Sequence, residues 1–122
     1  ERGGGKIVNV ASVNGIRPGT FQGIYSMTKA AVISLTQTLA MELGSDNIQV
    51  NAIAPGLVKT KFAQAIWEND ALLDGITNRT PLKRIGEPDE IAGMALFLSS
   101  PASNFATGQV FVVDGGVTVP ML

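Results

Sequence analysis

The stretch K-I-V-N-V-A-S-V-N-G-I-R-P-G-T-F-Q-G-I-Y-S-M-T-K, from Lys6 to Lys29, decides the fold because it holds a strand, a loop and a helix start in succession. Its first six residues, Lys6 to Ala11, are β-branched and nearly continuously apolar, as in a strand that is covered on both faces. The segment from Ser12 to Gly23 contains three glycines and a proline, which predicts a loop.

The rest of the chain continues this alternation. A helix of about twenty residues is predicted from Ile24 to Leu43, with Gly44 as a left-handed stop. A second strand, Ile48 to Ala54, ends at Pro55-Gly56, and a third strand runs from Gln109 to Val113.

Two further segments have helical character. Lys59 to Asn78 can form a helix that begins at Thr60, although Gly75 weakens this prediction. The segment that opens at Gly86 predicts a firmer helix ending at Ser99 or Ser100, because Pro88 suits a first helical turn.

Strands that alternate with helices predict an α/β fold with a parallel sheet. Three short parallel strands leave edges and faces that this chain alone cannot cover. We therefore expect residues 1–122 to form a single partial domain, half of a larger sheet.

Composition narrows the classes of function. The 9 basic and 10 acidic residues form no block of one sign, so we expect no nucleic-acid partner and no membrane-surface partner. Histidine and cysteine are absent, which removes the usual zinc ligands, and no metal site is expected.

The apolar runs are too short to span a bilayer. The lack of cysteine fits a reducing compartment, so we expect a cytoplasmic protein.

Ser12, Tyr25 and Lys29 form the candidate acid–base group. On a helix, Lys29 and the chain's one tyrosine, Tyr25, lie one turn apart on one face. A nearby ammonium stabilises a phenolate by Coulomb attraction, so this tyrosine could exchange a proton with a hydroxyl or carbonyl oxygen. Ser12, at a strand end, could hydrogen-bond the same oxygen. The spacing alone leaves two other interpretations open: an exposed tyrosine beside a solvated lysine, and a serine that only forms a turn.

Four motifs, in order, resemble the short-chain dehydrogenase/reductase family and together cover essentially the whole chain. They are the set Ser12, Tyr25 and Lys29; V-N-A-I-A-P-G-L-V-K-T (Val50 to Thr60); R-I-G-E-P-D-E-I-A-G-M-A-L-F-L-S-S (Arg84 to Ser100); and T-G-Q-V-F-V-V-D-G-G (Thr107 to Gly116). Within the family the chain is most similar to the 3-oxoacyl-carrier-protein reductases and the related carbonyl reductases.

This resemblance implies an oxidoreductase that transfers a hydride between NAD or NADP and a small carbonyl or alcohol substrate. Tyr25 would give the proton in carbonyl reduction, or take it in alcohol oxidation. Lys29 would support the phenolate and hold the nicotinamide ribose, and Ser12 would orient the substrate oxygen.

The nicotinamide half of the cofactor would be held by four further residues: Pro55, Gly56, Val58 and Thr60. A glycine here would let the backbone approach a ligand closely, and a helix beginning at Thr60 would offer free N–H groups. An ordinary strand-ending turn is the other interpretation of Pro55-Gly56.

The resemblance also implies that this chain is the C-terminal half of a Rossmann-like doubly wound parallel sheet, with the N-terminal dinucleotide half missing. The family's glycine-rich pyrophosphate turn and the residue that selects NAD or NADP have no counterpart here. Asn9 and Asn14 do not replace the family's active-site asparagine. The alternative hypothesis is therefore a non-catalytic fragment that folds by self-association and binds no cofactor.

Two segments around the candidate site carry excess apolar surface. Lys61 to Thr80 lies where the family has a mobile substrate lid, and it would line a pocket for an apolar or extended carbonyl substrate, or simply be an amphipathic helix. The Ile24–Leu43 helix is apolar on more than one face, which predicts a homo-oligomer. Burial of that helix within its own subunit is the alternative.

Overall fold

A computed structural model of the chain describes residues 3–119, and the three expected strands form one parallel sheet. The strand order is β1-β2-β3, with Val8 opposite Asn51 and Ile53 opposite Phe111. The strands are β1 (Gly5–Val10), β2 (Ile48–Pro55) and β3 (Val110–Val113). The predicted α/β fold with a parallel sheet is confirmed, and each strand lies within one residue of its predicted bounds.

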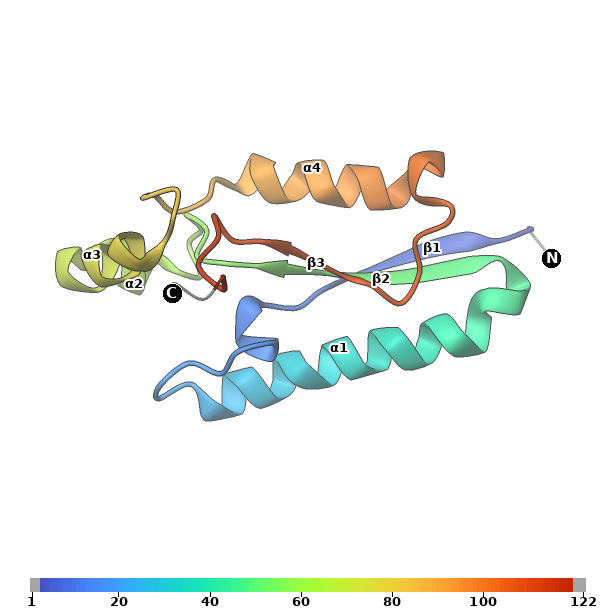
Figure 1. The fold of residues 1–122 in the computed structure, drawn as a ribbon, viewed down its shortest axis with the longest axis horizontal. Helices are drawn as coiled ribbons and strands as arrows, with labels where there is room; N and C mark the ends of the chain where they lie inside the picture. Colours follow the sequence, from blue (N-terminus) through green and yellow to red (C-terminus); the bar gives the residue numbers. More distant parts are fainter. Residues whose placement is uncertain (1–2, 120–122) are drawn as a thin grey trace.

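Two long helices cover opposite faces of this sheet, as Figure 1 shows, with the short helices gathered at one end of the strands. The helices of the described residues are α1 (Gly23–Leu43), α2 (Gln64–Trp67), α3 (Asp70–Arg79) and α4 (Pro88–Ser99), with 3-10 turns η1 (Val13–Gly15), η2 (Gly44–Asp46) and η3 (Pro101–Ser103).

The start of α4 follows the sequence prediction closely. Pro88 occupies the first turn, and the Glu90 carboxylate accepts the Glu87 N–H at 2.8 Å, as in one half of a capping box.

Strand β2 forms the centre of the core. Val50, Ala52, Ile53 and Ala54 are fully buried between the two helical layers. Thr36 of α1 is buried against the sheet, and its hydroxyl oxygen accepts a hydrogen bond from the Asn9 side-chain amide at 3.0 Å.

The edge strand β1 is covered less completely than its apolar sequence predicts. Val10 is 56% exposed, and every residue of β1 is either exposed or half-buried. Because β1 pairs only with β2 among the described residues, its other edge is unpaired. The expectation of a strand covered on both faces is therefore wrong for this chain, whereas the expectation of uncovered edges is met.

The predicted left-handed stop at Gly44 is wrong. Gly44 is right-handed, with φ of −60°, and the chain continues through η2 before Asn47 takes the left-handed conformation at φ of 58°. The Asn47 N–H donates to the Gly44 carbonyl oxygen at 3.0 Å. Asparagine tolerates this conformation better than most residues, so it ends the helical region in place of glycine.

The expected helix from Thr60 is also wrong, because the segment forms two shorter helices. Asn69 separates them, since its side chain accepts a hydrogen bond from the Leu72 N–H at 3.1 Å and begins α3. Gly75 lies inside α3 rather than at a break.

Candidate functional site

All the residues proposed from the sequence lie at or near the carboxyl end of the parallel strands. Ser12 follows β1, Pro55 and Gly56 end β2, and α1 begins on the same side of the molecule (Figure 1). In open parallel α/β sheets, ligands bind outside this end of the strands. The topology therefore places the candidate residues where a site is expected.

Ser12 has a structural contact of its own. It is 8% exposed, extended at φ of −164°, and its hydroxyl oxygen accepts the Asn14 N–H at 3.1 Å, which caps η1. This contact supports the turn-forming interpretation. A hydroxyl that accepts one hydrogen bond still carries a proton to donate, so the contact leaves room for a second role.

Tyr25 and Lys29 lie together on one face of α1, as the helical spacing predicts. The Lys29 ammonium nitrogen is 5.6 Å from the centroid of the Tyr25 ring, and both side chains are half-buried. The same nitrogen donates to the Val10 carbonyl oxygen at 3.3 Å. Lys29 therefore connects α1 to the end of β1, two residues before Ser12, and Tyr25 is not sealed inside the core.

Phe62 approaches the tyrosine from the loop that follows β2. The ring centroids of Tyr25 and Phe62 are 6.4 Å apart, with the planes inclined at 33°. The Phe62 side chain is 86% exposed, so it covers one side of Tyr25 without being packed in the core. The sequence placed Phe62 in an apolar segment but gave no sign of this pairing with Tyr25.

The four residues expected to hold a nicotinamide lie at the end of β2, which Pro55 closes, and in the segment that follows it. The Gly56 N–H donates to the Val113 carbonyl oxygen at 2.9 Å, and Val58 pairs with Gly86 in a parallel bridge. A Cβ on Gly56 would lie 2.9 Å from both the Cα and Cβ of Asp114. A glycine is thus required here because the backbone at Asp114, directly after β3, lies so close. The sequence did not reveal this reason.

Thr60 is held in a loop, contrary to the prediction that it begins a helix. Its hydroxyl oxygen accepts the Ala63 N–H at 3.3 Å, and its N–H donates to the Val58 carbonyl oxygen at 2.8 Å. The Thr60 carbonyl oxygen accepts the Trp67 indole N–H at 2.8 Å. No helix begins at Thr60, so the N–H groups that follow it belong to a turn and not to a first helical turn.

Trp67 is a feature whose role the sequence did not predict. Besides its hydrogen bond to Thr60, its ring lies 5.3 Å from the Lys59 ammonium nitrogen. These contacts fix α2 against the turn after β2. The only signal in the sequence was that the chain has a single tryptophan.

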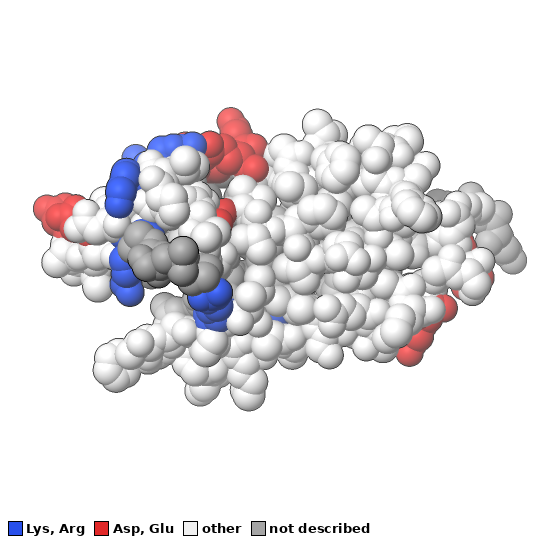
Figure 2. Space-filling view, viewed as in Figure 1, with Lys and Arg blue, Asp and Glu red and all other residues white. Residues whose placement is uncertain are grey.

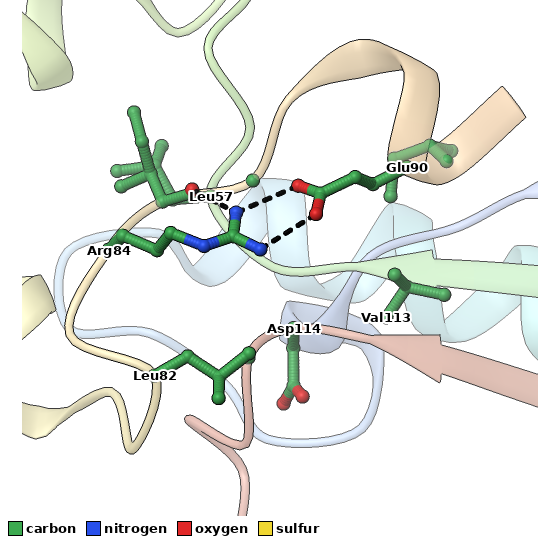
Figure 3. Close-up of a pocket in the computed structure, with 10 residues that line it drawn as sticks. Leu57, Leu82, Arg84, Glu90, Val113 and Asp114 are labelled. Carbon is green, nitrogen blue, oxygen red and sulfur yellow. Dashed lines mark hydrogen bonds and ion pairs between the residues drawn. The ribbon is translucent and has the colours of Figure 1, made fainter.

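A small cavity of about 90 Å³ lies near the ends of β2 and β3, beside the turn before α4 (Figure 3). The guanidinium of Arg84 and the carboxylate of Glu90 meet beside it in a bidentate pair at 2.7 and 2.8 Å. The hydrogen bond from Arg84, with a second from the Glu87 N–H, lowers the pKa of Glu90 to about 2. None of Ser12, Tyr25 and Lys29 lines this cavity, so it is distinct from the candidate acid–base site.

Asp114 lines the same cavity and holds the turn after β3. Burial raises its pKa, but hydrogen bonds to its carboxylate outweigh this effect and the pKa lies below its ordinary value. The donors are the Thr118 hydroxyl at 2.7 Å, the Thr118 N–H at 2.9 Å and the Gly116 N–H at 2.8 Å. This carboxylate is thus occupied in shaping the turn.

Residues 3–119 contain no group of three or more potential acidic metal ligands. Within the same range, no helix has the length and hydropathy needed to cross a bilayer. Charged side chains on the face in Figure 2 gather mainly at the end that carries α2 and α3, and the middle of this face carries few.

Comparison with known proteins gives consistent relatives. A family model described as Enoyl-(Acyl carrier protein) reductase matches residues 1–118. Dehydrogenase/reductase SDR family member 4 of Oryctolagus cuniculus is 43% identical over 116 residues, which are 95% of this chain and 45% of that protein. A tropinone reductase homolog of Arabidopsis thaliana is 44% identical over 117 residues, 96% of this chain and 44% of that protein.

Solved structures match over nearly the whole chain as well. A gluconate 5-dehydrogenase from Burkholderia cenocepacia, in complex with NADP and tartrate, has a TM-score of 0.95 at 39% identity, covering 98% of this chain and 47% of that one. A 4-hydroxyisoleucine dehydrogenase complexed with NADH has a TM-score of 0.91 at 38% identity, covering 95% and 48%. The chain thus spans less than half the length of these relatives.

Proposed function

The chain belongs to the short-chain dehydrogenase/reductase family, and from that membership we propose that it forms the catalytic part of an NAD(P)-dependent oxidoreductase that interconverts carbonyl compounds and alcohols. The observation that carries this proposal is the position of the Lys29 ammonium, 5.6 Å from the Tyr25 ring at the carboxyl end of the sheet. NAD(P), when bound, would supply or accept the hydride.

Each of the three polar side chains has a distinct role in this proposal. Tyr25 moves the proton at its phenol oxygen, because it is a half-buried tyrosine with a cation beside its ring. Lys29 stabilises the phenolate, and its hydrogen bond to Val10 fixes where that charge lies. Ser12 donates its free hydroxyl proton to the substrate oxygen, while η1 holds the hydroxyl in place.

The chain offers a suitable surface for the nicotinamide end of a dinucleotide. The Lys29 ammonium has one acceptor among the described residues, Val10, and an ammonium has three protons, so two remain for ribose hydroxyls. Pro55, Gly56, Val58 and Thr60 would line the other side. Relatives bound to NADP and to NADH support both cofactors equally.

We place the pyrophosphate and adenosine part of the cofactor on a separate N-terminal half. The partial coverage of the relatives and the unpaired edge of β1 support this arrangement. The second candidate function follows from the same observations: the 122-residue chain by itself is a non-catalytic fragment that associates with another copy and binds no cofactor.

Self-association is supported by the outer surface of α1. Its exposed apolar side chains are Ile24, Met27, Leu35 and Met41. A monomeric protein rarely leaves so many large apolar side chains of one helix in water, so we propose that α1 packs against a second subunit. A cytoplasmic location stays a prediction.

Two assays on matched proteins separate these functions. The full-length protein, meaning this chain joined to the proposed N-terminal half, should oxidise NADPH or NADH in the presence of at least one of three probes. The probes are ethyl acetoacetate, acetophenone and fructose. The 122-residue chain, titrated with NADPH, should give no change in cofactor fluorescence at submillimolar concentrations if the dinucleotide half is required. A full-length protein that oxidises neither cofactor with any probe would contradict the enzyme proposal.

A further inference from the structure

Gly15 makes the tightest contact between the Ser12 turn and helix α1. A Cβ on Gly15 would lie 2.8 Å from the Lys29 carbonyl carbon, 2.9 Å from its oxygen and 3.0 Å from the Ala30 nitrogen. All three are backbone atoms of a helix, which cannot rotate aside as a side chain does. Since carbon atoms normally stay about 3.5 Å apart, a methyl group here would displace the turn by about 0.7 Å.

The backbone conformation of Gly15 does not explain the glycine. The described glycines with positive φ are Gly3, Gly4, Gly108, Gly115 and Gly116, and Gly15 is not among them. An alanine could adopt the torsion angles of Gly15 without strain. The close approach to α1 is therefore the physical reason for a glycine at this position.

This contact joins the two parts of the candidate site. Gly15 closes the 3-10 turn that the Ser12 hydroxyl caps, and its N–H donates to the Ser12 carbonyl oxygen at 2.9 Å. On the helix side it touches Lys29 itself, whose ammonium returns to Val10 at 3.3 Å and faces Tyr25. The turn thus meets the helix at Gly15, and the strand that leads into the turn meets the helix at the end of the Lys29 side chain.

Two further hydrogen bonds hold the loop between turn and helix. The Asn14 carboxamide donates to the Gln22 side-chain oxygen, and the Gly19 N–H donates to the Ser26 hydroxyl at 3.4 Å. Because the loop is fastened at both ends, a displacement at Gly15 would be passed on to Ser12 rather than absorbed by the loop.

We propose that Gly15 is a positioning residue that sets the separation between the Ser12 hydroxyl and the Tyr25–Lys29 face of α1. The inference rests on the proposed function, since this separation affects a reaction only if the three groups act on one substrate oxygen. Misplacing reacting groups by an ångström slows a reaction by roughly 10²-fold. A methyl group at Gly15 would produce a shift of about two-thirds that size.

The test is Gly15→Ala in the full-length protein, assayed with NADPH and the best of the three probes. We expect kcat to fall roughly 10-fold, with KM and the NADPH dissociation constant within about twofold of wild type. Gly23→Ala is the matched control, because Gly23 lies two residues before Tyr25 and a Cβ there meets no atom within 4 Å. Its kcat should equal that of wild type.

The outcomes separate this inference from the proposed function. An active wild type together with a Gly15→Ala variant of unchanged kcat per folded molecule overturns the inference alone. A wild type that turns over no probe overturns both. If Gly15→Ala does not fold, Asn14→Ala loosens the same turn without adding volume; a several-fold lower kcat at unchanged KM supports the inference, and a wild-type kcat overturns it.

Discussion

The ammonium nitrogen of Lys29 lies 5.6 Å from the Tyr25 ring centroid and donates to the Val10 carbonyl oxygen at 3.3 Å. One side chain therefore joins the helix that carries the tyrosine to the strand that leads into Ser12. A solvated lysine beside an exposed tyrosine would make no such connection.

Replacing Lys29 by methionine should lower kcat by roughly 10²-fold, because a stabilising donor is removed from the site of developing charge. The NADPH dissociation constant should rise as well. Lys6→Met is the matched control, since Lys6 bonds Gln49 and Ser103 and lies at the amino end of β1. Steady-state kinetics on both variants of the full-length protein test this prediction. An equal decrease of kcat in the two variants would contradict a specific role for Lys29.

Replacing Ser12 by alanine should have two separable effects. Loss of the acceptor for the Asn14 N–H should lower the free energy of unfolding by about 1 kcal/mol. Loss of the hydroxyl donor should lower kcat by roughly 10²-fold. Urea unfolding and steady-state kinetics measure the two, with Ser12→Thr as the variant that keeps the hydroxyl. An alanine variant with lower stability and full turnover would make Ser12 a turn-forming residue only.

Gly56→Ala should destabilise the protein, because its Cβ would meet the Asp114 Cα and Cβ at 2.9 Å. Overpacking of this kind typically costs about 1–3 kcal/mol. Gly93→Ala in α4 is the control: its Cβ meets no atom within 4 Å, and the better helix propensity of alanine should stabilise by roughly 0.5–1 kcal/mol. The denaturant midpoint should fall for Gly56→Ala and rise for Gly93→Ala, relative to wild type. A Gly56→Ala variant with the midpoint of wild type would show that the turn after β2 can shift at little energetic cost.

The Arg84–Glu90 pair predicts a pH-dependent stability. The pKa of Glu90 is lowered from an ordinary value of 4.5 to about 2, first by the Arg84 hydrogen bond and then by the Glu87 N–H. A lowered native pKa means that ionised Glu90 stabilises the fold above about pH 4.5, and that this stabilisation is lost as the pH falls towards 2.

Glu90→Gln should therefore lower the melting temperature by a constant, small amount above pH 5, and the difference from wild type should shrink in acid. The effect is small because the pair is exposed to solvent. Thermal melts of the full-length protein across this range measure it. A difference that grows as the pH falls would contradict the assignment.

The sequence predicted the features that depend on local patterns. The parallel strands, the long α1 helix and the start of α4 at Pro88 follow from apolar periodicity and from the preference of proline for a first helical turn. The common face of Tyr25 and Lys29 follows from helical spacing alone. Their position at the carboxyl end of the sheet follows from the strand–loop–helix order.

Features that depend on distant contacts were not predictable. Nothing local to Gly15 reveals the Lys29 backbone against it, and nothing around Phe62 reveals Tyr25 beside it. The local preference for glycine as a helix stop was misleading at Gly44, because Asn47 could take the left-handed conformation three residues later. At Thr60 the hydroxyl does accept the Ala63 N–H, as at a helix start, but the chain forms only a turn there and α2 begins at Gln64.

The most direct measurement of the central claim is the turnover of Tyr25→Phe in the full-length protein with saturating NADPH. The substitution keeps the ring that packs near Phe62 and Lys29 and removes only the phenol oxygen. Turnover should fall by roughly 10²- to 10⁴-fold with cofactor affinity retained. Turnover near that of wild type would contradict proton transfer by Tyr25, and with it the site described here.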